Sequence, residues 1–436
     1  MGAPKYNLLF DGSILTNEFS KNDARSGIFF TTKNMFHQLV KRNDINLSLY
    51  CELSRYEDLQ KYLEKYNLNI DIINKCEYEG LQQFKGNCRK IKADLDKNKH
   101  PYKRIFFTLL YAITSGLLKI SEPFNLHLKL KQKLNDIDFF FSPCNQTPQF
   151  IRKKENIQTS VCLYDTIPLL LPDYYPGAFS GDYWLCDLVK SLGSDEMYFA
   201  ISESSKQDFL KFSKKITEEQ ITVSLLATAD HFVKINNWEK INETKNKYNI
   251  PTDKKYIFSL CTLEPRKNLI RAVKTFIEFI KKNNVDDLIF VLGGGQWERF
   301  ISELEKEIGN LGDYKSKIIK AGYIDDEDLP TLYSGAEWFV YTSQYEGFGL
   351  PPLEAMSCGC PVITSNNSSL PEVVGDAGIM IDWDNNEQHI EAYEKYYYNE
   401  DLRKEYAQKG LERAKTFSWE KCVNTIVEKL IERGDK

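Results

Sequence analysis

Several features that define special structural classes are missing from the sequence. Its 10 cysteines form no Cys-x-x-Cys pair, and the closest spacing, Cys358-Gly-Cys360, fits no usual metal knuckle. The longest apolar stretch, Ile105 to Ile120, is interrupted by polar residues and is shorter than the ~20 residues that a membrane-spanning helix needs. The first residues show no basic segment followed by an apolar run. We therefore expect a cytoplasmic protein with reduced thiols, no disulfide framework and no spanning helix.

Charge of one sign is also lacking. The 57 Lys and Arg residues nearly balance the 62 Asp and Glu residues, which leaves a formal net charge of -5. This balance argues against a nucleic-acid partner and against a disordered acidic chain. With 436 residues, the chain is long enough for two or three domains, each with its own core.

Short apolar runs alternate with helical patterns along the first half of the chain. This alternation is typical of a parallel sheet wrapped by helices. Thr32 to Val40 shows a helical pattern, and the expected strands are Tyr6 to Phe10, Ile45 to Tyr50, Phe139 to Phe141, Val161 to Tyr164 and Met197 to Ile201.

A second α/β series follows the polar segment Phe232 to Lys255, which we interpret as a connection between domains. Its expected helices are Leu269 to Lys281, Trp297 to Ile308 and Pro351 to Ser357. Its expected strands are Tyr256 to Cys261, Leu288 to Leu292, Lys317 to Ala321, Trp338 to Thr342, Pro361 to Thr364 and Gly378 to Ile381.

The last segment begins with Ser418 as a helix cap and continues with one apolar stripe, so we expect it to pack back on the first domain. The fold class is α/β. The sequence predicts two doubly wound, Rossmann-like domains, residues 1–235 and 250–415, that face each other across a cleft. Residues 416–436 form the crossover helix.

The most informative motif runs from Tyr345 to Met356 and reads YEGFGLPPLEAM. A glycine-punctuated loop after a strand leads into a helix opened by prolines, so the amides of Gly349 and Leu350 point out of the helix N-terminus, where an anion binds readily. Glu354 lies about one turn into this helix, within reach of a pair of ribose hydroxyls, and Glu346 lies on the loop. A purely structural role for both glutamates is the alternative; we favour function.

This motif resembles the E-x7-E signature of the retaining glycosyltransferases of the GT-B type, group 1 or family four. A second block, SLCTLEPRKN from Ser259 to Asn268, resembles the family's strand and basic turn. The resemblance implies that Arg266 and Lys267 bind the donor diphosphate, whose charge grows as it leaves, without a metal or other cofactor. Cys261 stands where the family usually has Gly, and Thr262 where it has Arg.

The resemblance assigns the other donor contacts as well. Glu346, with Arg266 and Lys267, forms the expected catalytic group. The remaining expected donor-binding residues are Glu354, Gly347, Phe348, Gly349, Leu350, Gly27 before a helix, Gly294 at a strand end, and Tyr323 where the family reads the nucleobase.

Tyr164 and Asp165 occupy the place where the family has a His before an Asp. We expect them to contact the transferred sugar or the acceptor. Because Tyr replaces His, a mechanism centred on histidine is disfavoured, and the resemblance implies front-face transfer without a protein general base.

The resemblance implies a metal-independent hexosyltransferase that moves a sugar, mannose or a related hexose, from a GDP-linked or UDP-linked donor. The acceptor is a growing bacterial surface glycan, such as a polysaccharide or lipopolysaccharide, or a lipid-linked saccharide. A catalytically silent partner subunit of the same fold is the alternative, favoured by Tyr164 and Cys261.

A basic segment, Lys85 to Arg104, precedes the apolar stretch and holds eight Lys and Arg residues against Asp94 and Asp96. This order is typical either of a solvated surface beside a core helix or of peripheral docking to the anionic inner face of the plasma membrane through residues 85–120. Exposure of the apolar face distinguishes the two readings.

Overall fold

The computed structural model describes residues 6–19, 27–52, 55–73, 106, 108–110, 112–113, 133–175, 177–178, 183–262, 264–294, 306 and 312–434. The chain divides into two compact units, residues 1–161 and 162–436. The domain limits that we expect from the sequence, 1–235 and 250–415, stay predictions.

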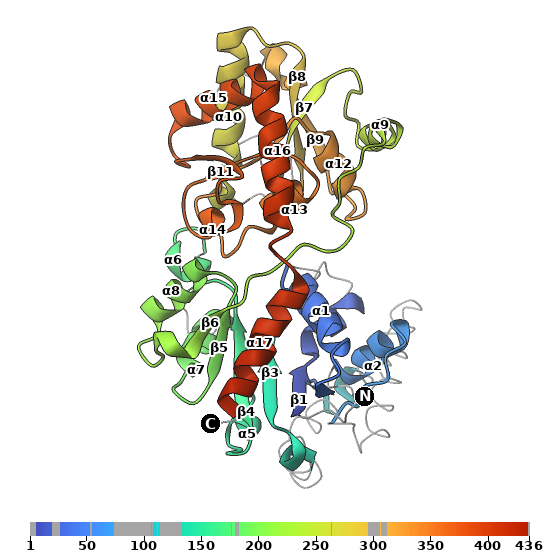
Figure 1. Cartoon of the computed structure of the whole chain (residues 1–436), viewed down its shortest axis with the longest axis vertical. Coiled ribbons are helices and arrows are strands. Elements are labelled where there is room, and N and C mark those ends of the chain that lie inside the picture. The colour runs from blue at the N-terminus through green and yellow to red at the C-terminus, as the bar shows by residue number, and fades with distance from the viewer. Residues whose placement is uncertain are drawn as a thin grey trace. The chain divides into compact units, whose positions relative to one another are not determined.

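The first sheet has six strands in the order β2-β1-β3-β4-β5-β6 (Figure 1). A parallel bridge between Leu49 and Ile72 lies beyond β2. The order is therefore that of a doubly wound sheet whose third strand is reduced to a bridge in the described residues. The strands are β1 (Tyr6–Asp11), β2 (Ile45–Tyr50), β3 (Phe139–Ser142), β4 (Gln158–Leu163), β5 (Met197–Ala200) and β6 (Ile221–Val223).

The second sheet also has six strands, in the order β12-β11-β10-β7-β8-β9, and its neighbouring strands pair in parallel. This is again the doubly wound order, complete in this half of the chain. The strands are β7 (Lys255–Leu260), β8 (Leu288–Gly293), β9 (Ile318–Gly322), β10 (Trp338–Tyr341), β11 (Val362–Ser365) and β12 (Gly378–Ile381).

The first half of the chain contributes the helices α1 (Gly27–Val40), α2 (Tyr56–Lys65), α5 (Gln149–Arg152), α6 (Ile167–Leu170), α7 (Trp184–Ser191) and α8 (Glu203–Phe212). The second half contributes α9 (Trp238–Lys247), α10 (Leu269–Asn283), α12 (Leu329–Gly335), α13 (Leu350–Ser357), α14 (Leu370–Val374), α15 (Asn386–Tyr398), α16 (Glu400–Ala414) and α17 (Trp419–Gly434).

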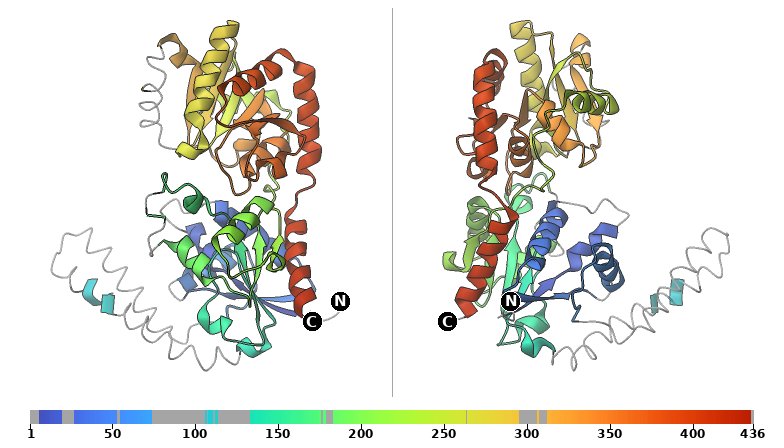
Figure 2. Two further views of the ribbon diagram at one scale, coloured as in Figure 1. Left: turned by 90° about the vertical axis from the view of Figure 1, so that its left-hand side faces the viewer. Right: turned by 45° about the vertical axis from the view of Figure 1, so that its right-hand side comes forward.

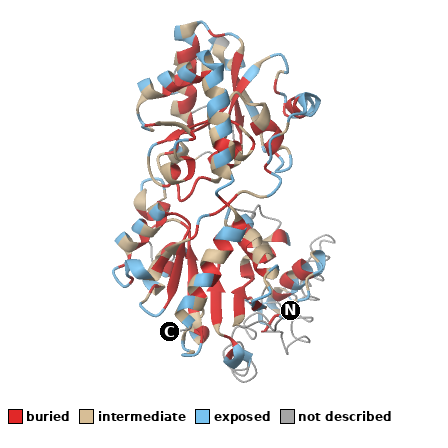
Figure 3. Ribbon diagram, viewed as in Figure 1, coloured by how far each residue is buried: buried red, intermediate tan, exposed pale blue. Residues whose placement is uncertain are grey.

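Helices cover the second sheet on both faces (Figures 1 and 2). On one face, α10 and α15 pack together and share a buried core with the strands. On the other, α12 and α13 pack on the sheet, with α9 and α16 against them. The strands are largely buried, whereas the helices expose their outer sides (Figure 3). The expected α/β class and the two doubly wound sheets are confirmed.

Most expected elements occur within two residues of their predicted bounds. The sequence reading missed β6, because this strand is only three residues long and lacks a clear alternation. The helix expected from Trp297 to Ile308 lies outside the described residues, apart from position 306.

Helix α17 returns to the first sheet, as expected. Its buried stripe includes Trp419, Cys422 and Ile426. The Trp419 indole N–H donates to the carbonyl of Thr228 (2.9 Å), and the Ser224 hydroxyl, directly after β6, donates to the carbonyl of Cys422 (3.0 Å). The amphipathic pattern was informative because an apolar stripe on a terminal helix has to cover another apolar surface.

The first turn of α8 holds the loop that leads into α13. The Ser202 hydroxyl donates to the carbonyl of Gly347 (2.7 Å), and the Ser205 hydroxyl lies 3.1 Å from the same carbonyl oxygen. One turn further along α8, the carboxylate of Asp208 accepts a hydrogen bond from the hydroxyl of Tyr345 (2.8 Å). These contacts fix the backbone of the loop whose side chains form the candidate site.

Burial raises the pKa of Asp208 to about 6, although the bond from Tyr345 acts in the opposite direction. The pKa in the folded protein lies above the ordinary value of an aspartate. The Asp208 carboxyl therefore stabilises the folded state fully only at a pH below the pKa that it has in the unfolded chain, ~4. This stabilisation is lost as the pH rises through about 6.

We expect Asp208→Asn to raise the free energy of unfolding above pH 7 by roughly 1–3 kcal/mol, because one pKa unit corresponds to about 1.4 kcal/mol. The amide oxygen of Asn can still accept the bond from Tyr345. The gain should shrink as the pH falls from 6 to 4, and denaturant unfolding at several pH values measures it. Asp187→Asn, at an exposed position of α7, is the control. A gain of equal size at every pH would contradict the prediction.

Candidate functional site

The topology of the second sheet explains why two distant segments meet. Strands β7 and β10 are parallel neighbours, so their carboxyl ends lie side by side. Arg266 and Lys267 follow β7 in a short 3-10 helix, Pro265–Lys267, and Glu346 lies on the loop after β10. This edge, at the carboxyl ends of the strands, is where doubly wound sheets bind ligands.

Glu346 is at the centre of the site. Its Oε1 accepts from Lys267 Nζ at 2.6 Å and lies 3.1 Å from Arg266 Nη1. All three side chains are about nine-tenths buried. Burial alone would raise the pKa of Glu346, but the two cations outweigh it and hold the pKa below its usual value. The carboxylate is therefore ionised and paired at neutral pH.

The Arg266 guanidinium is held along one edge. Its Nε donates to Glu264 Oε2 and to the Tyr175 hydroxyl, both at 2.9 Å, and Nη1 donates to the carbonyl of Tyr345 at 3.0 Å. Tyr175 in turn donates to Glu264 Oε2 (2.6 Å). Burial opposes ionisation of Glu264, but Arg266 and Tyr175 lower the pKa of Glu264 to about 2. The guanidinium thus has a fixed orientation.

Some donors in the site remain open toward a ligand. Within the described residues, Arg266 Nη2 contacts no acceptor. Lys267 Nζ donates to Glu346 and to the Tyr341 hydroxyl (2.7 Å), which leaves one of its three protons. The start of α13 has no side-chain cap, and its first turn contains two prolines, so the amides of Gly349 and Leu350 are its open donors.

Gly349 has a φ of 119°, and a Cβ there would lie 2.9 Å from a methyl of Leu370. Phe348 is buried and its ring meets Phe417 edge-on at 6.1 Å, so its side chain packs in the interior. The structure therefore brings Gly347, Gly349 and Leu350 into the site through their backbone, whereas the side chain of Phe348 faces the core.

Glu354 lies on α13, where its Oε2 accepts a hydrogen bond from the Tyr333 hydroxyl at 3.0 Å. Burial raises the pKa of Glu354 to about 7, and the bond from Tyr333 lowers it only in part. Near neutral pH this carboxyl is therefore poised between its two protonation states.

Gly294 and Tyr323 lie at the ends of neighbouring strands. The N–H of Gly294 donates to the carbonyl of Gly322 (2.8 Å). With a φ of 123°, a Cβ at Gly294 would lie 2.0 Å from the carbonyl oxygen of Cys261, so only glycine fits. Tyr323 is 78% exposed. Both assignments stay predictions.

Gly27 is the first residue of α1 in the unit 1–161 and is exposed. Its expected contact with the donor also stays a prediction.

Tyr164 and Asp165 follow β4. Tyr164 is buried, and its carbonyl accepts a bond from the Ser205 hydroxyl. Asp165 Oδ1 accepts from the N–H of Ile167 (3.1 Å), and a Cβ at Gly347 would lie 2.7 Å from the Asp165 Cβ. Burial raises the pKa of Asp165, despite the nearby positive charges. Asp165 therefore lies against the glutamate loop, and its expected contact with the sugar or the acceptor stays a prediction.

Sequence reasoning missed three tyrosines of the site, Tyr175, Tyr341 and Tyr333. A signal existed only for Tyr341, which lies near the end of the expected strand Trp338 to Thr342, at the ligand-binding edge of the sheet. Tyr175 carried no such signal, and its neighbour Tyr174 is the more exposed of the two.

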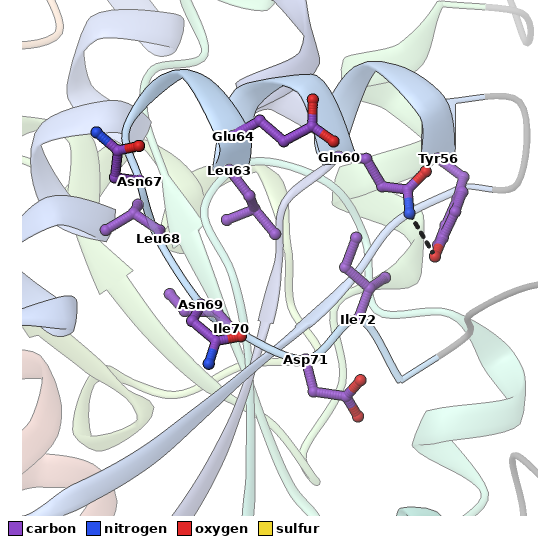
Figure 4. Close-up of a pocket in the computed structure, with 10 residues that line it drawn as sticks. All are labelled: Tyr56, Gln60, Leu63, Glu64, Asn67, Leu68, Asn69, Ile70, Asp71 and Ile72. Atoms are coloured by element: carbon purple, nitrogen blue, oxygen red, sulfur yellow. Dashed lines mark hydrogen bonds between the residues drawn. The ribbon is translucent and has the colours of Figure 1, made fainter.

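The described residues hold other features that bear on function. In that part of the chain, no group of three or more His, Cys, Asp or Glu side chains is placed to hold a metal ion. No helix there is long and apolar enough to span a membrane. A hollow of about 640 Å³ lies between α2 and the segment that follows it, lined mainly by aliphatic and amide side chains (Figure 4). It contains none of the expected site residues.

Comparison with protein families gives a match for residues 240–413, which fit the family described as glycosyl transferases group 1. Among curated proteins, the O-antigen chain mannosyltransferase B of Escherichia coli is 33% identical over 257 residues, which cover 59% of this chain and 65% of that protein. The serotype-specific mannosyltransferase WbdA of E. coli is 31% identical over 274 residues, 62% of this chain and 33% of WbdA. The chain thus spans less than two thirds of either relative.

Solved structures resemble the whole chain. Sucrose-phosphate synthase from Thermosynechococcus elongatus has a TM-score of 0.63 at 14% identity and covers 98% of this chain and 99% of its own. Anabaena HepE, solved with UDP and glucose, gives 0.63 at 15% identity and covers 98% and 100%. WaaG, a glycosyltransferase of lipopolysaccharide biosynthesis, gives 0.59 at 13% identity and covers 97% and 99%. These similarities confirm the expected GT-B fold, and residues 240–413 match the family of glycosyl transferases group 1.

Proposed function

We propose that the protein is a retaining glycosyltransferase that moves a hexose from a nucleotide-diphosphate sugar to a growing bacterial surface glycan or a lipid-linked saccharide. The observation that carries the proposal is the convergence of Arg266 and Lys267 on Glu346, on the loop that leads into the open start of α13. The mannosyltransferase names of the E. coli relatives favour mannose as the transferred sugar. The ligands of HepE favour a UDP-linked donor.

The chemistry of a diphosphate leaving group explains why these cations and amides suit the proposed reaction. Negative charge accumulates on it as the bond to the sugar breaks, and fixed donors stabilise that charge more than flexible ones. Arg266 Nη2, the third proton of Lys267 and the amides of Gly349 and Leu350 supply such donors. We propose that they replace a metal ion and that no cofactor takes part.

Glu346 and Glu354 have separate roles in the proposal. Glu346 fixes both cations and faces the transferred sugar, while Glu354 binds the ribose of the donor. Asp165, which is held neutral more readily than an exposed aspartate, is placed to contact the sugar or the acceptor.

The silent partner subunit is the second candidate, and two residues favour it. Tyr164 replaces the family's histidine, and Cys261 replaces its glycine. A silent subunit would have no reason to keep Lys267 and Arg266 oriented by buried partners, which is why we place it second.

Calorimetric titration with GDP, UDP and ADP tests the donor site. We expect one of them to bind, and Lys267→Ala to weaken that binding by about 10-fold to 100-fold, the loss of one charge-assisted hydrogen bond. Glu354→Ala and Lys267→Ala should each slow sugar transfer by about 100-fold or more with the fold intact.

Lys404→Ala is the matched control, because this exposed lysine pairs with Glu400 one turn away on α16 and belongs to none of the segments of the candidate site. Wild-type binding and transfer in both site variants, with folding verified by circular dichroism, would refute the site. If no diphosphate binds the wild-type protein, the silent-subunit reading replaces the enzyme.

We further propose that the protein works in the cytoplasm, at the inner face of the plasma membrane. The basic segment 85–104 lies outside the described residues. Among the described residues of the apolar stretch, Phe106, Leu109 and Ile113 follow helical spacing and are 60%, 57% and 56% exposed. Exposure of this stripe favours docking over a core helix.

Vesicle flotation tests the docking. We expect binding to vesicles that contain anionic lipid, no binding to neutral vesicles, and release as NaCl rises from about 0.1 to 0.5 M, because salt screens the basic segment. The double variant Phe106→Ser and Leu109→Ser should reduce flotation at least several-fold. Tyr398→Ser, at another exposed aromatic position, is the control. Equal flotation of both variants, or none by the wild type, would contradict the proposal.

A further inference from the structure

Tyr333 is a fully buried tyrosine whose ring is held on two sides. It meets Phe258 of β7 at 5.3 Å and Phe339 of β10 at 5.2 Å, both edge-on. A buried phenol has few orientations in such a packing and needs an acceptor for its proton. The acceptor here is Glu354 Oε2, at 3.0 Å.

Glu354 depends on this bond more than an exposed glutamate would. The Tyr333 hydroxyl donates a hydrogen bond to Oε2, whereas no described residue donates a hydrogen bond to Oε1. Other titratable groups around it are Asp326, before α12, and Cys358, at the end of α13. Neither is a cation, so among these groups only Tyr333 stabilises the ionised carboxylate.

We propose that Tyr333 is the positioning residue for Glu354, and that it makes the donor site selective for a ribose over a 2′-deoxyribose. The inference rests on the proposed function, in which Glu354 binds the ribose. Tyr333 does not touch the donor; it fixes one carboxylate oxygen so that the other faces the sugar.

The chemistry of the ribose gives the selectivity. Two adjacent hydroxyls can both donate to a carboxylate that is ionised and correctly turned. A 2′-deoxy sugar lacks one of these bonds, and a site built to bind a hydroxyl discriminates strongly against the analogue without it. A carboxylate free to rotate, or protonated, loses much of that discrimination.

The experiment compares the affinities of GDP and 2′-deoxy-GDP, and of UDP and 2′-deoxy-UDP, by calorimetry. For the pair that binds, we expect the wild-type protein to prefer the ribonucleotide by about 10-fold or more, one lost hydrogen bond to a charged group. Tyr333→Phe should reduce the preference to about 3-fold or less, with the affinity for the deoxynucleotide almost unchanged.

Tyr396→Phe is the matched control. Tyr396 is also fully buried in the same sheet domain, but its hydroxyl donates to the carbonyl of Val362 (3.1 Å), within the core. This variant should lose stability to a similar degree and keep the full preference for the ribonucleotide. If Tyr333 had a purely structural role, Tyr333→Phe would weaken the binding of both nucleotides equally and leave the ratio of their affinities unchanged. That result would overturn the inference.

A pH series gives a second measurement that does not need the Tyr333 variant to fold. In the wild-type protein, the preference for the ribonucleotide should decline as the pH falls from 8 to 6, because Glu354 becomes protonated. Glu354→Gln should show a small preference that is independent of pH. A wild-type preference that does not change with pH would contradict the dependence on an ionised Glu354. Failure of all nucleotides to bind would instead refute the proposed function.

Discussion

A buried carboxylate between two cations holds the candidate site together. Glu346 pairs with Lys267 and Arg266, and Glu264 balances the outer edge of the guanidinium. Removing one partner of such a group leaves an uncompensated buried charge, which is costly. Because two acids accompany two bases, the site presents oriented N–H groups rather than a large excess of positive charge. Selectivity then comes from geometry more than from attraction at a distance.

Three tyrosine hydroxyls form hydrogen bonds with the charged side chains of the site. Tyr175, Tyr341 and Tyr333 each bring a polar tip on an apolar body to a charged group of the site. A phenol can be packed in the core and still donate or accept a hydrogen bond at one point. The three hydroxyls therefore orient the charged groups of the site.

The sequence predicted what is local. The spacing of Glu346 and Glu354 around a glycine loop placed both near one helix start, and strand patterns predicted the strands of the second sheet. Contacts between distant segments carry no local signal: Tyr175 is 91 residues from Arg266, and Tyr333 is 21 residues from Glu354 in another helix. The sequence also did not predict that the side chain of Phe348 is buried. Its place in a signature loop suggested a contact with the ligand, whereas its ring packs against Phe417.

The pairing of β7 with β10 has a consequence for how the protein matures. Two further strands, β8 and β9, lie between them in the chain, and Lys267 and Glu346 are 79 residues apart. Closing such a long loop is entropically slow, so contacts of this kind form late in folding. A partly folded chain would hold these charges apart, and the candidate site would remain unassembled until the central strands of the second sheet have joined.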